Sequence, residues 1–158
     1  MQRPIYFCEG WFSAKKYAPE IWTEAQAQAA HDSGQKYTVL VDSIERPFCI
    51  IDVMTSKFIG VDFLDEHLRE ALTYQFQLAS PGQMFLTMAV HREFDGEEDK
   101  VARASRYTFT EDGKLQIRRT EFIPEHSQEV ADGEADVTSH YVAVPEFGHY
   151  EAFMKMER

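Results

Sequence analysis

Apolar residues at every second position constrain the fold of this chain more than any other feature. Between residues 72 and 78, leucine and aromatic residues alternate with threonine and glutamine. The same alternation resumes over 84–90, after the turn residues Ser80-Pro81-Gly82. A period of two is that of a half-buried β-strand, so the two runs predict a β-hairpin.

Comparable patterns predict further strands on both sides of this hairpin. They cover residues 37–41, 48–54, 58–64, 101–110, 115–123, 137–144 and 150–156. The connections are short, and no helix is spaced between strands as a parallel sheet requires. We therefore expect a mainly β fold of roughly eight strands, either an antiparallel up-and-down β-barrel or a strongly curved sheet.

The up-and-down strand order, with a turn at 110–115, is similar to that of small lipocalin-like barrels. This similarity is one of architecture, and an architecture does not by itself imply a function.

One substantial helix is predicted near the N-terminus. Residues 19–31 are rich in alanine and glutamine, with Glu20 and Glu24 in the first turns and Ser33-Gly34 at the end. We expect this helix to pack on the sheet or to cap it. A second segment, 65–71, predicts one or two helical turns with Asp65 as the N-cap.

Composition narrows the class of protein. The 158 residues suit one domain, 1–158, with one core that the 12 Phe and 7 Tyr can supply. We find no signal peptide and no apolar run of the roughly 18 residues that a membrane helix needs. Cys8 and Cys49 are expected to stay reduced as small buried side chains, which favours a cytoplasmic protein.

The formal net charge of −11 argues against nucleic acid and anionic membranes as partners. It permits a basic protein partner, because residues 120–154 contain no Lys or Arg. One hypothesis is therefore an acidic inhibitor or immunity-type protein that binds by charge complementarity. Its predicted partner-binding residues, from the loops 95–99 and 125–136, are Asp95, Glu97, Glu98, Asp99, Glu129, Asp132 and Glu134.

The register of the hairpin at 111–113 predicts a second kind of site. A three-residue loop with Gly113 in a left-handed conformation pairs Phe109 with Leu115 and Tyr107 with Ile117, which keeps apolar residues on one face. The same face then carries Arg103, Arg119 and Glu121, and charges on an inner face need partners or solvent.

These residues are the basis of our first hypothesis, a non-catalytic protein whose barrel holds an apolar or amphipathic small ligand. Arg103 and Arg119 would bind its anionic head, with Glu121 holding one guanidinium. Tyr107, Phe109, Tyr141 and Tyr150 are the predicted aromatic wall. The alternative is a structural ion-pair cluster that closes one end of the barrel.

Metal, cofactor and catalytic motifs are absent from the sequence. His91 and Glu93 share a strand face, and His126, His140 and His149 lie near carboxylates, but none has the spacing of a metal-ligand set. We therefore expect no metal and no cofactor. An enzyme would need Glu121 or a histidine with a displaced pKa, and no motif selects a reaction, so binding is favoured over catalysis.

Overall fold

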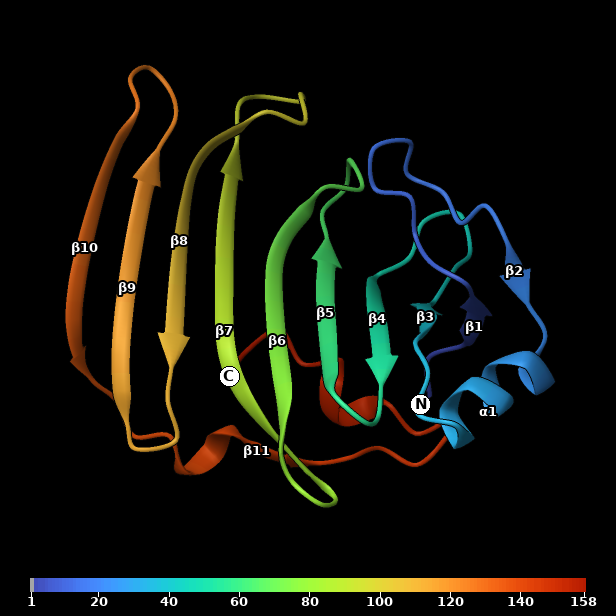
Figure 1. The fold of residues 1–158 in the computed structure, drawn as a ribbon. Coiled ribbons are helices and arrows are strands. Elements are labelled where there is room, and N and C mark those ends of the chain that lie inside the picture. Colours follow the sequence, from blue (N-terminus) through green and yellow to red (C-terminus); the bar gives the residue numbers. More distant parts are fainter. Residues whose placement is uncertain (1) are drawn as a thin grey trace.

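The computed structural model describes residues 2–158, and eleven antiparallel strands in one sheet dominate it. The strand order is β10-β9-β8-β7-β6-β5-β4-β3-β1-β2, with β11 paired to β7 (Figure 1). The strands are β1 (Ile5–Cys8), β2 (Ile21–Trp22), β3 (Tyr37–Val41), β4 (Cys49–Met54), β5 (Phe58–Leu64), β6 (Glu70–Ser80), β7 (Gln83–Phe94), β8 (Val101–Phe109), β9 (Lys114–Glu121), β10 (Ser127–Glu134) and β11 (Tyr141–Ala143). The mainly β, antiparallel prediction and the hairpin formed by β6 and β7 are confirmed.

The sheet is open, and the closed barrel expected from the strand pattern is not observed. β10 and β2 lie at the two ends of the strand order and do not pair with each other. All eight residues of β10 are exposed, so this strand has no apolar face to bury inside a barrel. The sheet instead buries one face beneath helix α1 (Glu24–Asp32) and a C-terminal segment, residues 144–158.

Two predicted strands near the C-terminus differ from the structure. Residues 150–156 contain the short 3₁₀ helix η2 (Glu151–Phe153), and 137–144 divides into η1 (Thr138–His140) and β11. Tyr150 and Phe153 are three residues apart, a spacing that places both on one side of a 3₁₀ turn, and both are buried. Packing of these two rings against the sheet therefore replaces strand pairing.

Helix α1 begins later than predicted, because Thr23 is its N-cap. The Thr23 side chain accepts a hydrogen bond from the Gln26 amide, and the Gln26 side chain accepts one from the Thr23 amide, which completes a capping box. Ile21 and Trp22, which precede the cap, form β2, and Ala27 and Ala30 are the buried positions of the helix. At Asp65 the predicted helical turns are absent, since the carboxylate accepts from the His67 and Arg69 amides in a tight turn.

Loss of this N-cap should measurably weaken the fold. We expect Thr23→Ala to lower the free energy of unfolding by about 1 kcal/mol, because the Gln26 amide loses its acceptor. Urea denaturation measures the change. Thr23→Ser keeps the hydroxyl and should stay within about 0.5 kcal/mol of the parent chain; an equal loss in both variants would contradict the cap.

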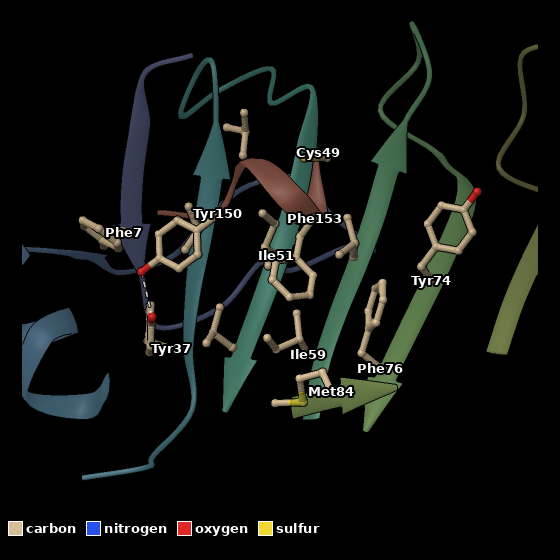
Figure 2. Close-up of a cluster of buried hydrophobic side chains, with 14 of the residues drawn as sticks. Phe7, Tyr37, Cys49, Ile51, Ile59, Tyr74, Phe76, Met84, Tyr150 and Phe153 are labelled. Atoms are coloured by element: carbon tan, nitrogen blue, oxygen red, sulfur yellow. Dashed lines mark hydrogen bonds between the residues drawn. The ribbon is translucent and has the colours of Figure 1, made fainter. Parts of the chain in front are cut away.

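The core lies on the side of the sheet that we call the first face, which carries Val39, Ile51, Val61 and Phe76. Figure 2 shows the Tyr150 and Phe153 rings of the C-terminal segment lying against these strands. The Tyr37 and Tyr150 hydroxyl oxygens are 2.7 Å apart and hydrogen bonded. His31 Nδ1 lies 2.8 Å from the Tyr37 hydroxyl, so this buried polar group has partners on two elements.

The opposite side, the second face, has a small apolar cluster near β1, β3 and β4, where Cys8, Leu40 and Ile50 are buried. Cys8 and Cys49 are both free and buried, and burial raises the pKa of each thiol to about 12. Both thiols are thus protonated at neutral pH. In the described part of the chain, no helix has the length and apolarity to cross a membrane.

Candidate ligand-binding site

The β8–β9 hairpin adopts the register expected from its side-chain pattern. Phe109 pairs with Leu115, Tyr107 with Ile117, Ser105 with Arg119 and Arg103 with Glu121. Gly113 has φ +87°, the left-handed conformation that the three-residue loop requires. The register therefore puts Arg103, Arg119 and Glu121 on the first face, beyond the part that the C-terminal segment covers.

The charged residues of the predicted ligand site lie on an exposed part of the sheet. Arg103 contacts Glu93 at 3.3 Å and Glu121 at 3.7 Å, and its side chain is 56% exposed. Arg119 is exposed on β9, opposite Glu129 of β10. Exposed ion pairs of this kind contribute little to stability.

The predicted aromatic wall is divided among three places. Tyr107 and Phe109 line a pocket on the first face. Tyr141 packs against Phe85 at 4.9 Å, and its hydroxyl donates to Glu111 Oε1. Tyr150 is fully buried in the core. The structure therefore brings together two of the seven predicted ligand-binding residues at this pocket.

This pocket, which we call the aromatic pocket, has a volume of about 270 Å³. Strands β6, β7 and β8 form its floor, and η1 and the C-terminal segment form opposite walls. Its lining is mostly apolar or aromatic. It comprises Leu72, Tyr74, Leu86, Ala89, His91, Tyr107, Phe109, His140 and Arg158.

The polar groups of the aromatic pocket include two histidine rings, the Tyr74 hydroxyl and the Arg158 guanidinium. His140 Nδ1 lies 3.2 Å from the Leu86 carbonyl oxygen, and the His140 ring packs edge-on against Phe109 at 4.5 Å. The Arg158 guanidinium lies over the Phe76 ring at 4.8 Å. Burial lowers the pKa of this guanidinium, and the lining contains no Asp or Glu side chain to pair with it.

The Tyr74 hydroxyl ties the C-terminal segment to the edge of the pocket. It donates a 2.5 Å hydrogen bond to the Met156 carbonyl oxygen, and burial raises its pKa, so the phenol stays neutral. This bond holds the end of the segment beside the floor of the pocket. Aromatic walls with a few fixed donors are typical of sites that orient a small molecule.

Three residues of the aromatic pocket, His91, His140 and Arg158, were not predicted from the sequence as ligand-binding residues. The predicted alternation over 84–90 would put His91 on the polar face, but an irregularity in the β6–β7 register places it opposite Ser105, on the same face as Tyr107. His140 and Arg158 reach the pocket only because residues 137–158 fold back over the sheet. No pattern within these residues indicates that return.

The predicted acidic partner-binding residues occupy two places. Asp95, Glu97, Glu98 and Asp99 lie in the β7–β8 loop, where Lys16 contacts Asp99 at 2.6 Å. Glu129, Asp132 and Glu134 lie on β10, which was predicted as a loop but pairs with β9. Nowhere in residues 2–158 do three or more His, Cys, Asp or Glu side chains gather as a metal site would require.

Comparison of the chain with protein families, with curated proteins and with solved structures finds no match.

Proposed function

We propose that this protein binds a small amphipathic anion in the aromatic pocket. The observation that carries the proposal is the lining itself: leucine and aromatic walls, with Arg158 and two histidines as the charged or chargeable side chains and no Asp or Glu side chain. An apolar body would contact Tyr107 and Phe109. An acidic head would interact with the Arg158 guanidinium.

The size of the pocket limits the ligand. A volume of about 270 Å³ lies just below the usual range of roughly 300–1,000 Å³ for ligand pockets, so a compact molecule with one ring system or a short chain suits it. Cations partly removed from water interact more strongly with an anion than exposed ones do. Ligand selection would therefore depend on both shape and charge.

A larger side chain that fills the aromatic pocket should weaken ligand binding strongly and leave the fold intact. Ala89 lies on the floor, and we expect Ala89→Phe to weaken binding of anilinonaphthalene sulfonate, an aromatic anion, by about 10-fold or more. Fluorescence titration measures the affinity. Ala131→Phe is the matched control, because Ala131 is exposed on β10 and lies outside the pocket; equal binding by all three proteins would refute the proposal.

Native mass spectrometry of the protein purified from its own source would identify the natural ligand. A released organic acid of low mass, retained by the Ala131→Phe chain and lost from the Ala89→Phe chain, supports the proposal. Retention by both variants would show that the molecule binds elsewhere.

A second candidate is binding of a basic protein, which the exposure of β10 favours. All eight residues of this edge strand are exposed, and three of them are Glu129, Asp132 and Glu134. An edge strand can pair with another chain, and its negative charge would select a basic one. The same mass spectra would then contain a basic protein that dissociates as salt is raised.

A further inference from the structure

Three arginines on neighbouring strands converge on the second face of the sheet, opposite the aromatic pocket. Arg106 of β8 pairs directly with Arg118 of β9. Arg106 also pairs with Val90 of β7, two residues from Arg92, which places Arg92 diagonally next to it. These three side chains line one groove of about 430 Å³, which we call the arginine groove.

None of the three guanidinium groups forms an ion pair within residues 2–158, although the chain has 27 acidic and 16 basic residues. Arg92 donates instead to the Thr73 hydroxyl at 2.8 Å and to the Glu70 carbonyl at 3.2 Å. These two bonds fix the orientation of its guanidinium. The arginine groove is therefore a local positive site on an acidic protein.

This arrangement opposes stability. Like charges directly opposite each other on neighbouring strands repel, as the Arg106 and Arg118 pair must. The Nε atom of Arg118 is also shielded from solvent and has no hydrogen-bond partner in the described chain. An unsatisfied buried donor costs free energy, and an acceptor supplied by a ligand would remove both penalties.

Apolar and aromatic groups surround the arginines. Met88 and Val90 lie in the same groove, and Phe122 is 44% exposed at its rim. The Phe122 ring packs edge-on against His126, with 5.8 Å between ring centroids, which places two aromatic rings beside the cations. A ligand that matches the groove thus has an anionic end and an apolar or aromatic body.

We propose that the arginine groove binds the phosphate group of a small phosphate monoester with an apolar or aromatic body. A phosphate monoester carries about −1.5 to −2 charges at neutral pH and three acceptor oxygens, which suits three guanidinium donors better than a single carboxylate does. Arginine presents its N–H groups as a rigid fork that matches these oxygens. Nucleic acid is disfavoured, because the net charge of −11 repels a polyanion outside this small groove.

The test is an NMR titration of the full chain with phenyl phosphate, compared with benzoate, which has the same ring and a carboxylate. At about 0.05 M salt, where screening is weak, we expect shifts at residues of β7, β8 and β9 and an affinity at least about 10-fold higher for phenyl phosphate. Equal affinity for benzoate would overturn the phosphate assignment. Absence of binding by phenyl phosphate would overturn the site.

Substitutions identify the groups responsible. Arg118→Gln should weaken phenyl phosphate binding by about 10-fold or more, and Arg106→Gln provides the same test should the first variant fold poorly. Arg119→Gln is the matched control: it removes the same charge one residue away, from an exposed site on the opposite face, and should change the affinity less than about 2-fold. Equal weakening by Arg118→Gln and Arg119→Gln would mean that only overall charge matters, and would refute the proposal.

The aromatic pocket provides a second control, since phenyl phosphate is also an aromatic anion. Arg158→Gln changes that pocket and leaves the arginine groove intact, so the phenyl phosphate affinity measured from the shifts of groove residues such as Arg106 and Arg118 should be unchanged. A loss in Arg158→Gln without a loss in Arg118→Gln would assign binding to the aromatic pocket and refute the groove. The two sites lie on opposite faces, so failure of one proposal leaves the other standing.

Discussion

Replacing Phe153 by alanine is expected to lower the free energy of unfolding by about 3–5 kcal/mol. Phe153 is 1% exposed, and its ring packs edge-on against Phe76 with 5.1 Å between ring centroids (Figure 2). Truncation removes buried apolar area and leaves a cavity that the rigid sheet cannot close. Urea denaturation followed by circular dichroism measures the loss.

The control for this prediction is Phe12→Ala, which removes the same ring from a site that is 44% exposed. We expect it to cost less than about 1 kcal/mol. Phe153→Ala should also weaken anilinonaphthalene sulfonate binding, because the C-terminal segment that carries Phe153 also carries the wall of the aromatic pocket. A Phe153→Ala chain as stable as the parent would show that the C-terminal segment is not part of the core.

Replacing Asp62 by asparagine is expected to raise stability by about 2–3 kcal/mol at neutral and alkaline pH. Asp62 lies on the second face of β5. Burial, followed by repulsion from Glu70, raises its pKa from 3.8 to about 6, although its carboxylate accepts a 2.6 Å hydrogen bond from the Thr73 hydroxyl. Asparagine keeps an acceptor oxygen for Thr73 and removes the buried charge.

The pH dependence of this effect follows from the direction of the shift. A carboxyl group whose pKa is higher in the folded chain destabilises the fold when it is ionised. Its contribution to stability is therefore greatest below its unfolded pKa, where it is protonated in both states. That contribution is lost as pH rises from about 4 to above about 6, because the folded chain must then hold a buried carboxylate. The Asp62→Asn advantage should therefore be largest above about pH 6 and small at about pH 4.

Denaturation curves of both chains across this pH range measure the difference. Asp132→Asn on exposed β10 is the control, since it removes the same formal charge without relieving burial, and it should show less than about 0.5 kcal/mol of change. An Asp62→Asn advantage that is the same at about pH 4 and about pH 8 would contradict the assignment to a buried carboxylate.

Local patterns in the sequence determined most of the strands and the pairing that side-chain alternation specifies. The β8–β9 register was predicted correctly because a slip of one residue would have moved Phe109 and Tyr107 to the polar face. The same register also places Arg106 opposite Arg118 on the second face, so the sequence implied this pairing as well. The predicted helix agrees with α1 except at its start. The composition predicted a start at residue 19, whereas the capping box of Thr23 with Gln26 begins α1 at Glu24.

Other features depended on contacts between residues far apart in the chain. β10 has no apolar alternation, so only backbone hydrogen bonds to β9 make it a strand. Residues 150–156 resemble a strand in sequence, but Tyr150 and Phe153 pack on the first face and the segment adds no strand to the sheet.

The sequence by itself thus determined most of the strands and the register of the β8–β9 hairpin, because alternation and turn geometry act over neighbouring residues. Only the tertiary structure decided what covers each face, and with it the aromatic pocket, because His140 and Arg158 reach Tyr107 through long-range packing of the C-terminal segment. That the sheet stays open was decided in the same way. Such contacts depend on the whole core, and local periodicity carries no information about them.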